Sequence, residues 1–183
     1  MSGVFPALVG PLTLVDLLLL LALLVIVPLG LRLVPFAGPR SRQVLKIARI
    51  VQPLGAIAAV ASFFITPGWT SGAIALGWLI TCIVAALAGL VELIERRSLR
   101  PTDLAPAAAV AYLSVGAGWL VLSRAGLRPE GFSHEIVELT GVHFHYAGFA
   151  ATLMAALTMR AVRDRGRLAT LAAMATMLVV LGV

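Results

Sequence analysis

Six apolar segments follow one another along this chain, and the first five are each long enough to cross a lipid bilayer. They lie at about 11–36, 45–65, 71–94, 104–123, 139–159 and 168–183. A helix of roughly 20 residues spans the hydrocarbon core of a bilayer. Backbone groups in hydrocarbon must be bonded within the protein, and alternating strand patterns are absent, so these segments are expected to be helices. The sequence therefore predicts an all-α fold, a polytopic transmembrane bundle of about six helices.

The composition fits a membrane protein. Apolar residues make up 61% of the chain and charged residues 12%, a balance that a soluble domain of this length could not cover with polar surface. The formal net charge is +6, but the arginines lie in short clusters without interleaved aromatic side chains, which argues against nucleic acid as a partner. The lipid bilayer is the expected partner. The single cysteine, Cys82, excludes an intramolecular disulfide.

One transmembrane domain is expected over residues 1–183. The first apolar run lacks a basic segment before it and a small-residue cleavage site after it, so we expect a retained span and not a signal peptide. The last run has 16 residues after Arg167, which is short for a full span, and no polar flank follows it. We therefore expect a truncated last helix and a protein that continues beyond Val183.

Basic residues are concentrated in alternate loops. One set of loops holds only Arg124 and Arg128. The other set, together with Arg32, holds Arg40, Arg42, Lys46, Arg49, Arg96, Arg97, Arg100, Arg160, Arg163, Arg165 and Arg167. Because loops rich in Lys and Arg remain in the cytoplasm, the sequence predicts a multi-pass protein of the cell membrane with an extracytoplasmic N-terminus and cytoplasmic basic loops.

Ionisable side chains in apolar surroundings gather near the predicted outer face, and all three histidines lie in the stretch 133–146. At about 100° per residue, His134, Glu138 and His145 share one face of a helix, whereas His143 points nearly opposite to His145. One unbroken helix therefore cannot gather both neighbouring imidazoles. The candidate polar site comprises His134, Glu138, His143, His145, Tyr146 and, from the first span, Asp16.

Two interpretations of this site are open. Ionisable groups within a membrane are costly and usually functional, so the cluster could handle a proton, a metal or a polar headgroup. Alternatively, the rings lie at interfacial depth and hydrogen-bond neighbouring helices. The His-x-His spacing of His143 and His145 is a weak metal signal, and helical geometry opposes chelation by the pair. The pattern assigns no cofactor.

Other polar residues have structural and functional interpretations side by side. Asp16 either pairs with a histidine of the fifth helix or favours the N-terminus of its own helix. Glu92 can reach Arg96 four residues later as an ordinary interfacial pair. Gln52, beside Pro53, either hydrogen-bonds a neighbouring helix or lines a broken-helix cavity of the kind found in transporters.

The run Leu139–Phe149, LTGVHFHYAGF, resembles the signature of the YndJ-like bacterial membrane proteins, in which a His-Phe-His-Tyr block lies in a transmembrane segment. The resemblance covers about a dozen residues and otherwise the hydropathy pattern. The resemblance implies a polytopic inner-membrane protein. Only His143, His145 and Tyr146 of the candidate site match the family's His-Phe-His-Tyr block. Members of this family are sometimes labelled transporters, but the label implies no substrate.

Three functions are consistent with these features. The first is a transporter or permease in which His143, His145 and Tyr146 bind a small molecule or relay protons from the outer side. The alternative is a membrane-embedded enzyme acting on a lipid or isoprenoid, with Glu138 or Asp16 as the proton donor and the histidines as bases or metal ligands. The third is a non-catalytic subunit or sensor in which histidine protonation shifts helix packing. Transport ranks first, since no recognised catalytic spacing is present.

Overall fold

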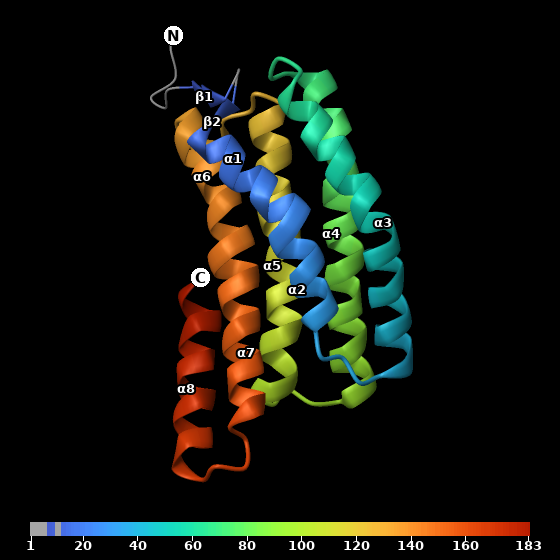
Figure 1. The fold of residues 1–183 in the computed structure, drawn as a ribbon, viewed down its shortest axis with the longest axis vertical. Coiled ribbons are helices and arrows are strands. Elements are labelled where there is room, and N and C mark those ends of the chain that lie inside the picture. Colours follow the sequence, from blue (N-terminus) through green and yellow to red (C-terminus); the bar gives the residue numbers. More distant parts are fainter. Residues whose placement is uncertain (1–6, 10–11) are drawn as a thin grey trace.

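The computed structural model describes residues 7–9 and 12–183, and long helices run side by side along its long axis (Figure 1). A short antiparallel hairpin of β1 (Ala7–Val9) and β2 (Leu12–Thr13) comes first. The first rod then consists of α1 (Leu14–Leu21), a π-helical segment η1 (Ala22–Ile26) and α2 (Val27–Leu33). The rod begins at Leu14 because Thr13 caps it. The predicted start at Pro11 lies outside the described residues.

Five further rods follow within the described part of the chain. The second, third and fourth are α3 (Pro39–Phe63), α4 (Trp69–Arg96) and α5 (Pro101–Arg124). A single 3-10 turn, η2 (Pro129–Gly131), leads to the fifth rod, which joins α6 (His134–His143), the π-helical segment η3 (Phe144–Ala151) and α7 (Thr152–Ala161). The sixth is α8 (Arg167–Gly182). The predicted all-α bundle of about six helices is confirmed.

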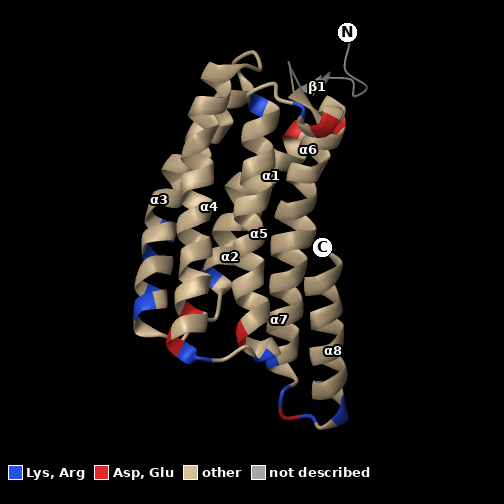
Figure 2. Ribbon diagram, turned by 180° about the vertical axis from the view of Figure 1, so that it is seen from behind, with Lys and Arg blue, Asp and Glu red and all other residues tan. Residues whose placement is uncertain are grey.

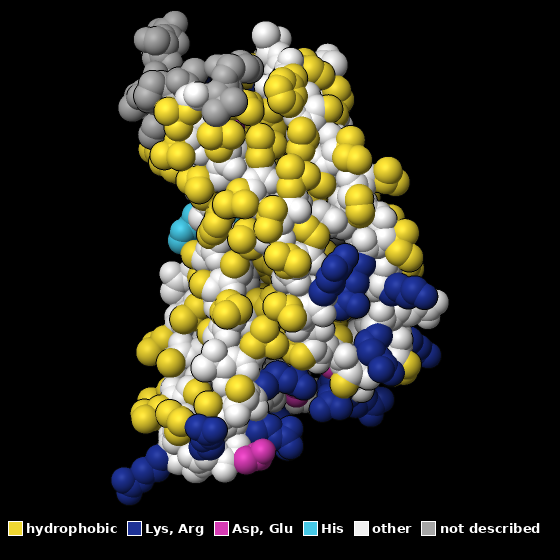
Figure 3. All heavy atoms as spheres, in the orientation of Figure 1, with side chains coloured by type: hydrophobic (Ala, Val, Ile, Leu, Met, Phe, Trp, Pro, Cys, Tyr) yellow, Lys and Arg dark blue, Asp and Glu magenta, His cyan; other side chains and the backbone are white. Residues whose placement is uncertain are grey.

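The helices pack in a simple order. α4 lies between α3 and α5, the fifth rod packs against α5 and the first rod, and α8 covers α7 and the lower part of α5 (Figure 1). The core between them contains Leu19, Leu23, Trp78, Leu113 and Phe149, all without solvent exposure. Hydrophobic side chains also cover the face of the bundle seen in Figure 3, and many exposed residues are leucine or isoleucine, as expected for helices whose solvent is lipid.

Four stretches are long and apolar enough to cross a membrane, namely Leu14–Leu33, Pro39–Phe63, Trp69–Arg96 and Pro101–Arg124. These four helices make the chain a membrane protein. The fifth rod carries all three histidines in its first half and is not among the four, and α8 is a shorter apolar helix of 16 residues. Crossing by the last two rods therefore stays a prediction.

The π-helical segments create polar contacts within the apolar bundle. A π turn shifts the backbone ladder by one residue and leaves carbonyl oxygens open to other donors. In η1, the carbonyl of Leu23 accepts a hydrogen bond from the Gln52 amide of α3 at 2.9 Å. Gln52 is buried, so its predicted role as a polar contact between neighbouring helices is confirmed.

Candidate functional site

His145 lies in the centre of the bundle with both ring nitrogens hydrogen-bonded. Its side chain is fully buried. The indole Nε1 of Trp78 donates to Nε2 at 3.0 Å, and Nδ1 lies 2.7 Å from the carbonyl oxygen of Gly141. An indole N–H can only donate, so Nε2 is the acceptor and the ring proton is on Nδ1. This arrangement describes a neutral imidazole that joins the fifth rod to α4.

α5 provides the room for this imidazole through Gly116. A Cβ atom at Gly116 would lie 2.8 Å from Nδ1 of His145 and 3.0 Å from Cβ of Phe144. Both distances are below normal van der Waals contact, so a larger residue would displace the ring or the helix. The position of His145 therefore depends on the absence of a side chain on the neighbouring helix.

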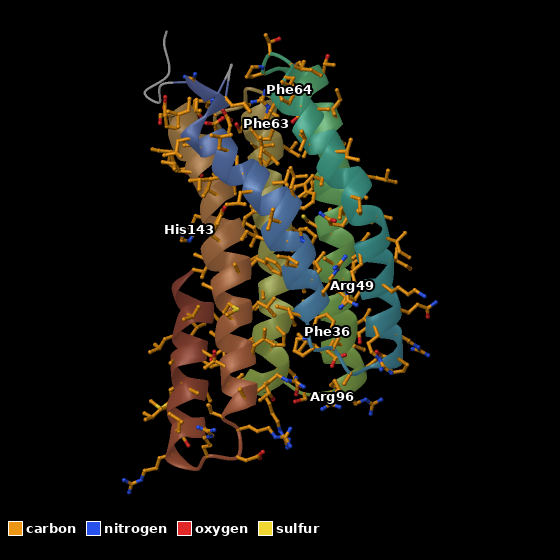
Figure 4. All side chains as sticks on the ribbon, in the orientation of Figure 1. Phe36, Arg49, Phe63, Phe64, Arg96 and His143 are labelled. Atoms are coloured by element: carbon orange, nitrogen blue, oxygen red, sulfur yellow. The ribbon has the colours of Figure 1, made fainter. Side chains whose placement is uncertain are left out.

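His143 has the opposite environment. It is exposed on the outside of the fifth rod (Figure 4), and its ring lies edge-on to Phe144 with the centroids 5.4 Å apart. His143 and His145 point to opposite faces, as the helical spacing predicts, so the two rings do not come together.

Tyr146 connects the fifth rod to the first. Its hydroxyl donates to the carbonyl oxygen of Leu18 at 3.0 Å, just before the π-helical segment of that rod. The side chain is half-buried. His145 and Tyr146 therefore hold the fifth rod to two different neighbours at nearly the same height.

A second group of polar side chains lies at the end of the bundle where the N-terminus is, and we call it the outer cluster. It consists of Asp16, Ser123, Arg124, His134 and Glu138. Glu138 is buried at its centre and accepts a hydrogen bond from the Ser123 hydroxyl at 3.1 Å. Nε2 of His134 lies 3.1 Å from the same Glu138 oxygen.

Arg124 and its neighbour Ser123 are the members of the outer cluster that sequence reasoning missed. The guanidinium of Arg124 is buried and donates to the carbonyls of Ser62 and Ile65, at 2.9 and 2.7 Å, and to the Ser71 hydroxyl at 3.2 Å. It also lies 4.9 Å above the centre of the Phe63 ring. The C-terminal end of a helix carries partial negative charge, so a cation placed at its last carbonyls is stabilising. The sequence indicates only a loop charge at Arg124, because the end of α3 is more than 50 residues away in the sequence.

Asp16 forms a capping box with Thr13. The Thr13 backbone N–H and hydroxyl both donate to Oδ2 of Asp16 at 2.8 Å, and the Asp16 N–H donates to the Thr13 hydroxyl at 3.2 Å. Of the two interpretations of Asp16, these contacts favour the helix N-terminus. The charges of Asp16 and Glu138 nevertheless both interact with the charge of Arg124, so the three groups are electrostatically coupled.

His134 begins the fifth rod, before its apolar part, and its side chain is partly exposed. The hydrogen bond to Glu138 raises the pKa of His134 above its ordinary value, and the charges of Glu138 and Glu135 add to this rise. Partial burial of the ring and the charge of Arg124 act in the opposite direction, but the net shift is upward. The protonated imidazole is therefore favoured at this position.

A family model described as YndJ-like protein matches residues 17–183. The chain belongs to the YndJ-like family. Its matched region contains every member of the candidate site except Asp16, which lies one residue before the match. No curated protein and no solved structure matches the chain.

The YndJ-like chain thus divides its candidate residues among three places. His134, Glu138 and Asp16 contribute to the outer cluster with Arg124, His145 and Tyr146 lie below it between helices, and His143 faces outward. Over residues 7–9 and 12–183, no group of three or more His, Cys, Asp or Glu side chains could hold a metal ion.

Proposed function

We propose that this YndJ-like membrane protein is a transporter or permease whose outer end opens and closes with the protonation of His134. The observation that carries the proposal is the burial of Asp16, Arg124 and Glu138 together at one end of an apolar bundle. Buried ionisable groups are expensive in a membrane protein and commonly mark proton or substrate pathways.

The charge balance of the outer cluster supports the proposal. Two buried carboxylates, Asp16 and Glu138, lie in the field of one buried guanidinium, Arg124. The buried part is therefore one positive charge short, and the protonated ring of His134 supplies it at Glu138. When His134 loses its proton, Glu138 keeps an uncompensated negative charge, and water entering the outer end can stabilise it.

The contacts below the cluster connect this change to substrate binding. Tyr146 bonds the first rod and His145 bonds α4, so separating the outer ends of these helices frees a hydroxyl and an imidazole for a polar small molecule. In this proposal His145 and Tyr146 bind substrate only in the open state. His143, on the outside, lies away from that path.

An enzyme acting on a lipid or isoprenoid is the alternative, and one observation favours it. The carboxylate of Glu138 and the imidazole of His134 lie 3.1 Å apart near the outer surface, which is the spacing required for proton exchange between an acid and a base. Such an enzyme would change the lipids of a vesicle, whereas a transporter would not. Mass spectrometry of the vesicle lipids after incubation distinguishes the two.

The opening is tested with a cysteine at Ser123, in a chain whose native cysteine is replaced (Cys82→Ser). Ser123 is buried against Glu138. We expect a membrane-impermeant maleimide added outside proteoliposomes to label Ser123→Cys increasingly as the pH rises from 6 to 8.5. Rates are divided by those of Ser133→Cys, an exposed position, to remove the pH dependence of the thiol itself.

Glu138→Gln is the diagnostic variant. It removes the carboxylate that needs His134, so the corrected labelling of Ser123→Cys should no longer depend on pH. If the corrected rate is already constant between pH 6 and 8.5 with Glu138 present, the outer cluster does not gate the bundle and the proposal fails.

A further inference from the structure

Three adjoining hollows lie at the opposite, basic end of the molecule, where α5 begins beside α8. The first, about 430 Å³, is polar and is lined by the loop Arg96–Arg100 and by Asp103. The second, about 260 Å³, shares Arg100 with the first and adds Arg163 and Met159. The third, about 390 Å³, shares Pro101 and Ala173 with the second and is almost wholly apolar. Together they connect an arginine-rich surface to an apolar groove.

The apolar groove follows one face of α8. It is lined by Thr170, Ala173, Met174, Met177, Leu178 and Leu181, together with Pro101. Leu181 lies eleven positions after Thr170, which is about 16 Å along a helix. This is close to half of the roughly 30 Å hydrocarbon thickness of a bilayer. The groove therefore has the length of one acyl chain within one leaflet.

The surface above the groove is positively charged. Arg96, Arg97, Arg100 and Arg163 line the first two hollows, and dark blue side chains gather at this end in Figure 3. The carboxylate of Asp103 accepts a hydrogen bond from the Ser98 hydroxyl at 2.7 Å and forms an ion pair with Arg96 at 3.9 Å. Among the described residues, no carboxylate forms an ion pair with Arg100. Arg163 lies 3.4 Å from the carboxylate of the next residue, Asp164, and both of these side chains are exposed. A phosphate would supply the missing negative charge at Arg100.

We propose that this composite groove binds an anionic phospholipid of the leaflet at the basic end. The phosphate lies between Arg100 and Arg163, and one acyl chain follows α8 from Thr170 toward Leu181. A free phosphate ion would leave the apolar part unused. A second copy, inserted in the same orientation, would bring its own arginines against this basic rim. The combination of charge and apolar length fits an anionic lipid best.

The headgroup part is tested by native mass spectrometry of the purified full chain in detergent. We expect dioleoyl phosphatidylglycerol to bind at least about tenfold more tightly than dioleoyl phosphatidylcholine, since each arginine near the headgroup favours negative charge. The double variant Arg100→Gln/Arg163→Gln should remove this preference. Arg40→Gln/Arg42→Gln loses the same charge at the start of α3, at positions that line none of the three hollows, and should retain the preference.

The acyl part has its own variants. Thr170→Trp places a large side chain in the groove and should reduce phosphatidylglycerol binding about as strongly as the arginine changes. Ala175→Trp adds the same bulk at an exposed position of α8 outside the groove and should leave binding unchanged.

Three outcomes overturn the proposal. Equal binding of the two lipids would indicate an unselective lipid shell. Displacement of phosphatidylglycerol by millimolar inorganic phosphate, with Thr170→Trp without effect, would indicate a simple anion site. A dimer that Thr170→Trp dissociates while lipid binding is unaffected would assign the groove to a second copy of the chain.

Discussion

Gly116 determines how closely α5 approaches the imidazole of His145. We expect Gly116→Ala to lower the free energy of unfolding by about 1–3 kcal/mol, because the new methyl group overlaps the ring of His145. Gly118→Ala is the matched control on the same helix, since a Cβ there meets no atom within 4 Å. Denaturation in detergent micelles measures both variants. Equal stability of the two would show that the bundle accommodates the methyl group without cost.

The pair of His134 and Glu138 makes stability depend on pH. The pKa of His134 is higher in the folded chain than its ordinary value of about 6.5. The protonated ring therefore stabilises the fold fully below about pH 6.5, while Glu138 is ionised, and this contribution is lost as the pH rises through the folded pKa. We expect the melting temperature of the native chain to exceed that of His134→Gln most at pH 6 and to converge with it toward pH 9.

His143→Gln is the control for this measurement because its ring lies on the outside of the same rod. Its melting curve should run parallel to that of the native chain across the pH range. A His134→Gln variant with an unchanged pH profile would contradict the assigned pair. The size of the effect is expected to be within about 1 kcal/mol, since the His134 ring is partly exposed.

The side chains of the fifth rod show what a sequence can predict at the residue scale. Helical periodicity places His143 and His145 on opposite faces, and their exposure agrees. The partners were not predictable, because Trp78 is 67 residues before His145 and Leu18 is 128 residues before Tyr146. Such contacts depend on which helices become neighbours, and no local pattern encodes that.

At the scale of the elements, the N-terminus of α3 is capped by two carboxylates of another helix, α4. Glu92 of α4 accepts hydrogen bonds from the backbone N–H groups of Ala37 and Gly38, at 3.0 and 2.9 Å, and from the Ser41 hydroxyl. Glu95 accepts from the N–H groups of Arg40 and Ser41 at 3.1 and 2.9 Å. The open donors at the start of α3 are thus satisfied from outside the helix.

This contact replaces the pair predicted between Glu92 and Arg96. Both oxygens of Glu92 are directed to α3, and Arg96 lies instead 3.9 Å from Asp103. The spacing of four residues made the local pair attractive. No direct ion pair forms because Glu92 is buried, where the backbone donors at the positive end of α3 stabilise a carboxylate well. The half-exposed Arg96 acts on Glu92 only through its charge.

Glu92→Ala is expected to open the first turn of α3. Hydrogen exchange of the Ala37 and Gly38 amides should accelerate, and the unfolding free energy should fall by about 2–3 kcal/mol, because three bonds to a charged acceptor are lost. Glu95→Ala should instead accelerate exchange at Arg40 and Ser41, with a smaller loss of stability. Exchange unchanged at all four amides would contradict the assignment.

The number of helices could be predicted from the sequence, but the π-helical segments within them could not. Six apolar runs predict six rods because hydrocarbon requires closed backbone bonding. The π-helical segments η1 and η3 leave no clear sequence signal, since a one-residue shift of the ladder preserves apolar composition. Yet the side chains of Gln52 and Thr152 donate hydrogen bonds to the carbonyls of Leu23 and Ala147 within these segments, the first across to another helix and the second within the same rod.

At the scale of the whole molecule, charges gather at two ends separated by an apolar middle (Figure 2). The end near the N-terminus contains the outer cluster, and the other end contains the loops rich in arginine. By the positive-inside rule, the arginine-rich end is expected in the cytoplasm. Its orientation remains a prediction of the sequence.

Single-cysteine variants of the Cys82→Ser chain test this orientation in intact cells. Ser133→Cys, at the start of the fifth rod, should react with an impermeant thiol reagent added outside. Leu99→Cys, in an arginine-rich loop and exposed, should react only after the membrane is permeabilised. The reverse pattern would place the outer cluster in the cytoplasm.

The two ends of α3 also bear on how the chain is made. Glu92 and Glu95 of α4 bind its first turn, and Arg124 of α5 binds its last carbonyls. All of these side chains emerge from the ribosome after α3 itself. We therefore expect α3, with its arginines and its internal Pro53, to reach its final position in the membrane only once the next two helices have been synthesised.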